Sequence, residues 1–147
     1  SDAEELLDDP RVQVVKEHVH TLAELLVDSE YEAPDLSGHT VVVQPHCHQS
    51  SVLGFESDQK ILESTGAKII TLGGCCGLAG NFGVEQGHYE MSLKVAENEL
   101  MPTLREHPEA IFISDGFSCR KQVTDLTDKD AMTMAQLLAA HSSKKRA

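Results

Sequence analysis

Three short apolar runs, separated by segments with helical periodicity, constrain the fold of this chain more than any other feature. They are His39–Pro45, Ala67–Leu72 and Ala110–Ser114. The first is rich in β-branched residues and bounded by glycine and proline, which is typical of a strand buried on both faces. Strands that alternate with helices form parallel sheets through crossover connections. We therefore predict a layered, Rossmann-like α/β fold, with a small parallel sheet of three to four strands and helices on both faces.

The helical segments lie before, between and after these runs. Apolar residues recur every three or four positions from Val12 to Leu26, which predicts one amphipathic helix that starts at Pro10 with Asp9 as its N-cap. The other predicted helices cover Ser57–Ser64, Gly87–Arg105 with a kink or division at Pro102, and about Asp128–His141 with Thr127 as N-cap.

Charge and composition exclude several classes of function. The 147 residues carry a net charge of −12, and residues 1–40 hold 11 acidic side chains against two basic ones. A chain this acidic repels a phosphate backbone, so we expect no nucleic-acid partner. No apolar run approaches the length of a membrane span, and the first residues lack the basic and apolar pattern of a signal peptide. We expect a cytoplasmic protein whose four cysteines stay reduced.

Each cysteine follows one of the predicted strands. Cys47 comes after the first strand, Cys75 and Cys76 after the second, and Cys119 after the third, so that none is predicted to lie inside a helix or strand. The carboxyl ends of parallel strands lie at one edge of a sheet, where sites form in α/β proteins. We therefore expect the four thiols to converge there.

Four converging thiols favour a soft metal ion or an iron–sulfur cluster, since both take sulfur ligands. Glycines beside the cysteine pair let the backbone bend and leave amides free to donate to sulfur. His46 and His48 flank Cys47 as further ligands, outer-shell donors or substrate-facing groups. Three alternatives remain open: buried structural cysteines, a nucleophile formed by Cys47 and a neighbouring histidine, and a vicinal Cys75–Cys76 disulfide.

A second glycine-rich stretch, residues 77–83, follows the cysteine pair. It lacks the Lys-Ser/Thr ending of a P-loop, and its glycine spacing does not fit the dinucleotide fingerprint. We interpret it as a scaffold for the cysteines. The predicted metal ligands are Cys47, Cys75, Cys76 and Cys119, and the predicted cofactor-binding residues are Gly74, Gly77, Gly80, His46 and His48.

The strings around these cysteines resemble a known family. Residues 74–83 read GCCGLAGNFG, residues 45–48 read PHCH, and residues 115–120 read DGFSCR. Together they resemble the cysteine-rich CCG domain found in the B subunit of heterodisulfide reductase and in the iron–sulfur subunit of glycolate oxidase. They are most similar to the C-terminal end of fusions between an FAD-linked oxidase and an iron–sulfur oxidoreductase. The resemblance covers about residues 38–125.

The resemblance implies an iron–sulfur electron-transfer domain of a flavin-linked oxidoreductase for D-lactate, glycolate or a related 2-hydroxy acid. The flavin, carried elsewhere in the parent protein, would take a hydride from the substrate. Electrons would then pass through iron–sulfur centres, a [4Fe–4S] cluster here among them, to a quinone or another acceptor. The implied partners are the FAD-linked oxidase domain and a further iron–sulfur region. The parent complex would place the chain in the cytoplasm or on the inner face of the membrane.

The chain departs from the family at one position. The family ends in Cys-x-x-Cys, but Gly116 replaces the first of these cysteines, so four of the five family thiols are present. We expect a single domain, with an N-terminal helix and acidic loop (1–37), a CCG core (38–125) and a C-terminal helix with a basic tail (126–147), excised from a longer protein and without turnover alone. A structural zinc module and a thiol–disulfide redox protein that uses Cys47 or Cys75 and Cys76 are the alternatives.

Overall fold

Four parallel strands form one sheet in the computed structural model, which describes residues 3–142. The strands are β1 (Thr40–Val43), β2 (Lys68–Thr71), β3 (Ile111–Ile113) and β4 (Ala131–Met132). Their order across the sheet is β2-β1-β3-β4, and Val42 of β1 pairs with Ile70 on one side and Phe112 on the other. The predicted parallel α/β class is confirmed, and all three predicted strands form.

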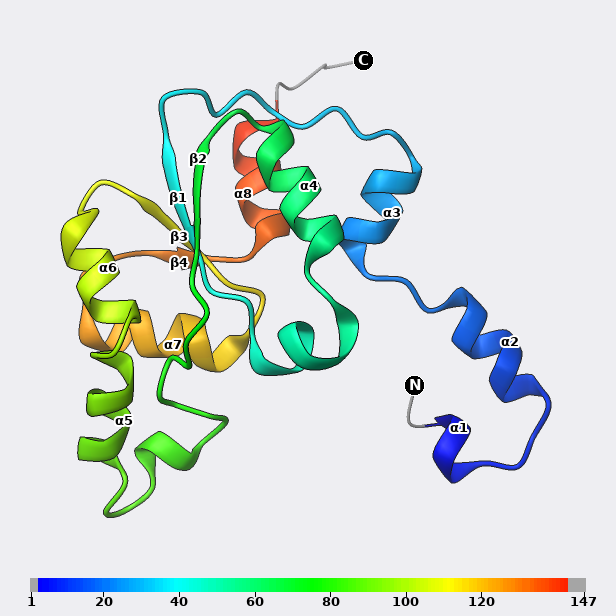
Figure 1. Cartoon of the computed structure of the whole chain (residues 1–147), viewed down its shortest axis with the longest axis horizontal. Coiled ribbons are helices and arrows are strands. Elements are labelled where there is room, and N and C mark those ends of the chain that lie inside the picture. The colour runs from blue at the N-terminus through cyan, green and yellow to red at the C-terminus, as the bar shows by residue number, and fades with distance from the viewer. Residues whose placement is uncertain (1–2, 143–147) are drawn as a thin grey trace.

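Helices cover both faces of this sheet (Figure 1). They are α1 (Ala3–Leu6), α2 (Arg11–His18), α3 (Leu22–Asp28), α4 (Glu56–Ser64), α5 (Tyr89–Ala96), α6 (Leu100–Glu106), α7 (Phe117–Leu126) and α8 (Met134–His141), together with the short helical turns η1 (Gln49–Leu53) and η2 (Phe82–Val84). One apolar cluster joins the sheet to α3, α4 and α8, and the other joins it to α5, α6 and α7.

Alternate residues of the central strand feed the two clusters. Val42 packs into the cluster with α5, α6 and α7, while Val41 and Val43 pack into the opposite one. This follows from the two-residue period of a strand, and it requires apolar side chains at every position. The β-branched run in the sequence is therefore explained by burial on both faces.

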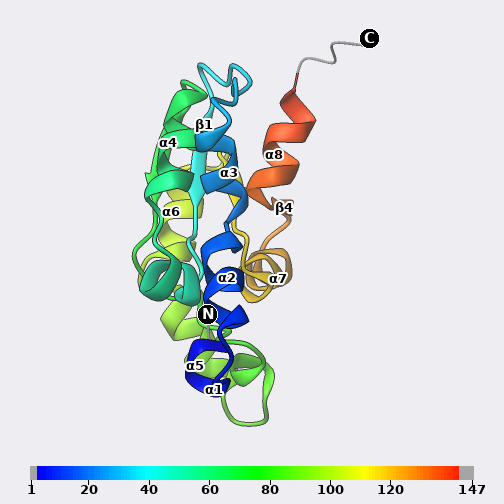
Figure 2. The ribbon, with the colours of Figure 1, turned by 90° about the vertical axis from the view of Figure 1, so that its right-hand side faces the viewer.

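The N-terminal region differs from the prediction of one amphipathic helix. The chain forms α2 and α3 with a break between them, where Thr21 caps α3 through a reciprocal capping box with Glu24. Val15 and Val19 are more than half exposed instead of lying on a buried stripe. Figure 1 shows α1 and α2 extending from the α/β body as an arm, and Figure 2 shows this arm in front of the body. A local cap has therefore outweighed the apolar periodicity.

The segment after β2 divides into α5 and α6, as predicted, but the break lies before Pro102. Proline occupies the first turn of α6, where its missing N–H has no intrahelical acceptor to lose. After β3 the chain forms a helix that the sequence patterns did not predict, α7, which begins at Phe117.

The prediction of a last helix from Asp128 is also wrong. Thr127 ends α7, residues 131 and 132 form β4, and the helix starts after Thr133. The predicted basic tail at residues 143–147 lies outside the described residues. Across residues 3–142, no helix has the length and apolar character needed to cross a bilayer.

The cap of α8 gives a first testable prediction. Thr133 Oγ1 accepts a hydrogen bond from the Gln136 N–H (3.1 Å), and Gln136 Oε1 accepts one from the Thr133 N–H (2.8 Å). Thr133→Ala should lower the free energy of unfolding in urea by about 1 kcal/mol, because the start of a packed helix loses its cap. Thr124→Ala, at an exposed site on α7, is the matched control and should change it by less than about 0.5 kcal/mol.

Candidate functional site

The sheet order creates a crevice between β1 and β3. The connection from β1 leads to β2 on one side, while the connection from β3 leads to β4 on the other. Chains that leave adjacent parallel strands in opposite directions open a crevice beyond the carboxyl ends of those strands. A cavity of about 590 Å³ lies here, lined by His46, Cys47, His48, Cys75, Cys76, Ala79, Gly80, Asp115, Gly116, Phe117, Ser118 and Cys119. All four thiols meet in this cavity, which we name the thiol cavity.

The local structure of two cysteines differs from the prediction. Cys119 is the third residue of α7, and Cys47 lies in the helical turn that leads into η1. The prediction that no cysteine lies in a helix is therefore wrong, although the expected convergence holds. Cys75 and Cys76 occupy the loop after β2, as predicted.

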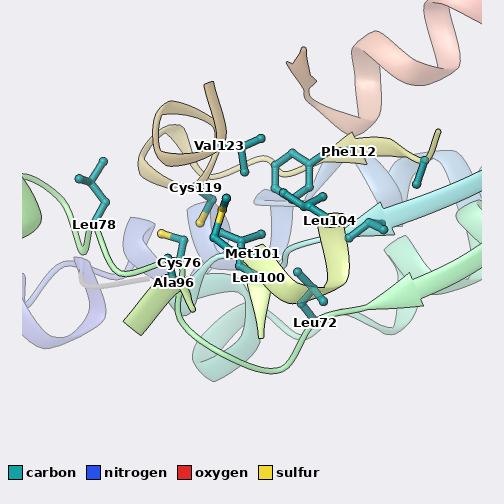
Figure 3. Close-up of a cluster of buried hydrophobic side chains, with 12 residues drawn as sticks. Leu72, Cys76, Leu78, Ala96, Leu100, Met101, Leu104, Phe112, Cys119 and Val123 are labelled. Carbon is teal, nitrogen blue, oxygen red and sulfur yellow. The ribbon is translucent and has the colours of Figure 1, made fainter. Parts of the chain in front are cut away.

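The thiols form two close pairs. Cys76 and Cys119 are 4% and 5% exposed, hydrogen-bond to each other, and belong to the apolar cluster beneath the thiol cavity. Figure 3 shows the two side chains next to each other, Cys119 on α7 and Cys76 on the loop. Cys75 is half-buried and lies near the exposed Cys47, which lines the same cavity. Each pair therefore joins the loop after β2 to a different neighbouring segment.

Hydrogen bonds give the buried pair unequal acidities. The Cys119 thiol and the backbone N–H groups of Leu78 and Ala79 donate to the Cys76 thiolate, which lowers the pKa of Cys76 to about 6 despite its burial. The same bond, with desolvation, raises the pKa of Cys119 because the shared proton stays there. Desolvation also raises the pKa of Cys75. The Gly77 N–H, which donates to Cys75 Sγ at 3.3 Å, lowers this pKa by a smaller amount.

This asymmetry predicts a distinctive thiol titration. In the reduced, metal-free chain, one thiolate should appear near pH 6, as followed by its ultraviolet absorbance. Cys119→Ala removes the first donor, so the transition should move up toward the ordinary thiol pKa of about 8.5. Cys47→Ala is the control and should leave the transition in place. A transition that stays near pH 6 in Cys119→Ala would contradict this assignment.

The spacing of the donors bears on which metal group fits. Among residues 3–142, no three His, Cys, Asp or Glu side chains are arranged to hold one metal ion. A tetrahedral zinc site needs four sulfurs at about 2.3 Å from a single atom. An iron–sulfur cluster takes each thiolate on a different iron, so its ligands are spread more widely. The cavity of about 590 Å³ that the four thiols line has room for a cluster, whereas the contact within each thiol pair is closer than the spacing of thiolates on separate irons.

The two histidines face the thiol cavity with nearly parallel rings, 6.3 Å apart at 5°. The Gln49 N–H donates to His46 Nδ1 at 3.3 Å. When neutral, His46 therefore carries its proton on Nε2 and acts as a donor. This favours an outer-shell role for His46, one of the three roles that the sequence left open.

The predicted glycines divide into two groups. Gly80 lines the thiol cavity, whereas Gly74 and Gly77 do not. Gly77 has φ +93°, and a Cβ there would lie 2.2 Å from the Ser92 carbonyl oxygen, so the loop packs directly on α5. Gly116, which stands where the family that the sequence resembles has a cysteine, also packs closely. A Cβ at this position would lie 2.6 Å from the Cβ of His46, so a fifth thiol does not fit this backbone.

Sequence reasoning missed several residues of the site. Asp115, Phe117 and Ser118 line the thiol cavity, and Phe117 is 73% exposed at its rim. Gln44 and Ser114 are buried, and the Ser114 hydroxyl donates to the Gln44 carbonyl oxygen. The sequence held one indication, because all five follow β1 or β3 at the edge where the cysteines were expected.

Comparison with known proteins gives two partial similarities. Over 97 residues, 64% of this chain, it is 34% identical to D-2-hydroxyglutarate dehydrogenase from Pantoea ananatis (strain AJ13355). Over 91 residues, 60% of this chain, it is 32% identical to D-2-hydroxyglutarate dehydrogenase from Escherichia coli (strain K12). The matched segments make up 10% and 9% of those proteins, so the chain spans about a tenth of each relative's length. No family model matches the chain, and no solved structure matches it. The similarity links the chain to a small part of proteins named for the oxidation of a 2-hydroxy acid.

Proposed function

We propose that this chain is an iron–sulfur electron-transfer unit of a flavin-linked oxidoreductase that acts on a 2-hydroxy acid. The observation that carries the proposal is the convergence of four thiols from three separate segments in one cavity at the edge of the sheet. The partial similarity to two D-2-hydroxyglutarate dehydrogenases supports the substrate class. The FAD-linked domain, a further iron–sulfur region and the final acceptor, a quinone or another, would be partners outside this chain.

Cys47, Cys75, Cys76 and Cys119 would hold a [4Fe–4S] cluster, which supplies reversible one-electron storage when bound. The backbone N–H groups of Leu78 and Ala79 already donate to Cys76. Hydrogen bonds to cluster sulfurs raise the potential, because they stabilise the extra negative charge of the reduced state. Apolar residues beneath Cys76 and Cys119 exclude water from one side of the site, and the exposed Cys47 marks the side open to a partner.

Metal analysis of protein purified without oxygen tests this proposal. The expected result is about four irons and four acid-labile sulfides per chain with a brown chromophore. One zinc ion per chain without colour would instead identify a structural zinc module. Absence of metal, even after anaerobic reconstitution with ferrous iron and sulfide, would overturn the cluster assignment.

The unequal thiol pair favours a second candidate, a thiol–disulfide redox protein. The Cys76 thiolate lies against the Cys119 thiol. A small disulfide could oxidise this pair: the two thiols would lose two electrons and two protons to form one S–S bond, and the oxidant would gain them as two thiols. In this case the metal-free chain would be oxidised reversibly, and mass spectrometry would identify a Cys76–Cys119 link.

A further inference from the structure

One buried amide contacts two of the three segments that carry the thiols. The Gln44 side chain is 97% buried directly after β1. Its Nε2 donates to the Gly74 carbonyl oxygen at 2.8 Å and to the Pro45 carbonyl oxygen at 3.2 Å. Pro45 lies two residues before Cys47, and Gly74 directly precedes Cys75. A single side chain therefore ties the Cys47 segment to the cysteine pair.

The backbone of the same residue reaches the third segment. Ser114 Oγ, directly after β3, donates to the Gln44 carbonyl oxygen at 2.6 Å, and the Gly116 N–H donates to Ser114 Oγ at 3.2 Å. Arg120 of α7 donates from Nη1 to the Ser114 carbonyl oxygen at 2.7 Å. These bonds fix the start of α7, and with it Cys119, relative to Gln44.

The loop of the cysteine pair is also held from its outer side. Glu99, between α5 and α6, accepts the N–H groups of Gly73 (3.1 Å) and Gly74 (2.5 Å) on Oε2. Gly74 thus donates to Glu99 and accepts from Gln44, which leaves the peptides before Cys75 little freedom. All three segments that carry the thiols therefore meet at Gln44. Gln44 itself begins the segment of Cys47, its side-chain amide holds Gly74 before Cys75, and its backbone carbonyl holds Ser114 before Cys119.

The amide of Gln44 is not a simple filler of the core. Its Oε1 is buried and has no hydrogen-bond partner among residues 3–142, whereas an apolar side chain of similar shape would leave no such oxygen. The two carbonyl oxygens at Pro45 and Gly74, in turn, need the N–H groups that only a side-chain amide supplies here. The side-chain Nε2 of Gln44 is thus the group that links these two segments.

We infer that Gln44 is the positioning residue of the thiol cavity, because its amide and its backbone carbonyl hold the three thiol-bearing segments in place relative to one another before any metal binds. The inference deepens the proposed function and rests on it for the metal readout. Gln44 lines no part of the thiol cavity and acts only through the segments that it ties together. Outer-shell contacts of this kind orient ligands, and their loss weakens metal sites by about 10–100-fold.

Gln44→Met tests the inference, since it keeps volume and burial but removes both N–H donors. Gln122→Met is the matched control: Gln122 is 4% exposed on α7 and donates to Ser92 Oγ at 2.9 Å, outside the network that joins the thiol segments. Two measurements are made on the full chain. The first is anaerobic titration with Co²⁺, whose charge-transfer and visible bands report thiolate ligands. The second is hydrogen–deuterium exchange of the metal-free protein.

In Gln44→Met, Co²⁺ affinity should fall about tenfold or more and the visible bands should change. Exchange should accelerate in residues 73–77 and 115–119 while the strands stay protected. Gln122→Met should keep the Co²⁺ affinity of the wild type and its exchange in residues 73–77, while loss of the bond to Ser92 Oγ loosens α7 alone. If Gln44→Met behaves like Gln122→Met, or loses protection equally throughout the chain, the inference is wrong. If the wild type binds neither Co²⁺ nor iron, the proposed function fails, and the exchange comparison still decides the role of Gln44.

Discussion

Cys119→Ala should reduce the iron and sulfide content of the reconstituted chain to background while leaving the fold intact. The thiol is 5% exposed and lies among apolar residues, so alanine fits its site with a small void, at a cost of about 1 kcal/mol in the free energy of unfolding. Loss of an outer-shell contact alone weakens metal sites by about 10–100-fold, and loss of a direct ligand should cost more. Iron and sulfide analysis, with circular dichroism to report folding, measures both effects.

Ser118→Ala is the matched control for this variant. Ser118 is the neighbour of Cys119 in α7, lines the same cavity and donates a 3.3 Å hydrogen bond to the Gly80 carbonyl oxygen. It should bind iron like the wild type. Normal iron and sulfide content in Cys119→Ala would remove this cysteine from the ligand set and restrict the site to Cys47, Cys75 and Cys76.

Gly77→Ala should be the most destabilising single-methyl addition among the glycines of the cysteine loop. The position combines φ +93° with a Cβ that would lie 2.2 Å from the Ser92 carbonyl oxygen, an atom fixed in α5. A side chain in this left-handed region costs about 1–2 kcal/mol, and the steric overlap adds about 1–3 kcal/mol. Urea unfolding should therefore give a loss of about 3 kcal/mol or more, with displacement of the adjacent Cys76.

Two neighbouring glycines separate these contributions. Gly80 has φ +74° and no atom within 4 Å of the position that an alanine methyl group would take, so Gly80→Ala should show the conformational cost alone. Gly73 has neither feature, and Gly73→Ala should change the free energy of unfolding by less than about 0.5 kcal/mol. Equal losses for all three variants would mean that this loop does not pack on α5 as described.

Sequence patterns predicted the sheet because its two central strands, β1 and β3, are largely buried on both faces. The apolar side chains of Val41–Val43 are all buried only when helices cover both faces of the sheet. A run of consecutive apolar residues therefore indicates this arrangement in the sequence alone. The N-terminal arm escaped prediction for the opposite reason. Its apolar residues have the spacing of one helix, but the Thr21–Glu24 capping box starts a new helix within that run. Val15 and Val19 are exposed, so that a continuous helix would gain no burial from them.

The site was predictable in position but not in internal geometry. The thiols could be placed at one edge because each follows a strand of a parallel sheet. Their division into a Cys76–Cys119 pair and a Cys47–Cys75 pair depends on α7, which the sequence patterns did not reveal. Gln44 was overlooked because a glutamine beside a strand carries no motif, and its contacts with residues 74 and 114 arise only from strand order.

The strand order β2-β1-β3-β4 also sets the order of events when the polypeptide is made. The central strand is the first to be synthesised, and the residue that completes the thiol set, Cys119, comes 72 positions after Cys47. Contacts so distant along a chain form only after the intervening loops have closed. A nascent chain that ends before α7 presents three thiols with no buried pair. If the proposed cluster is present, its four-thiol site would be complete only after α7 has left the ribosome, so that iron and sulfide would be delivered to a chain that is already folded.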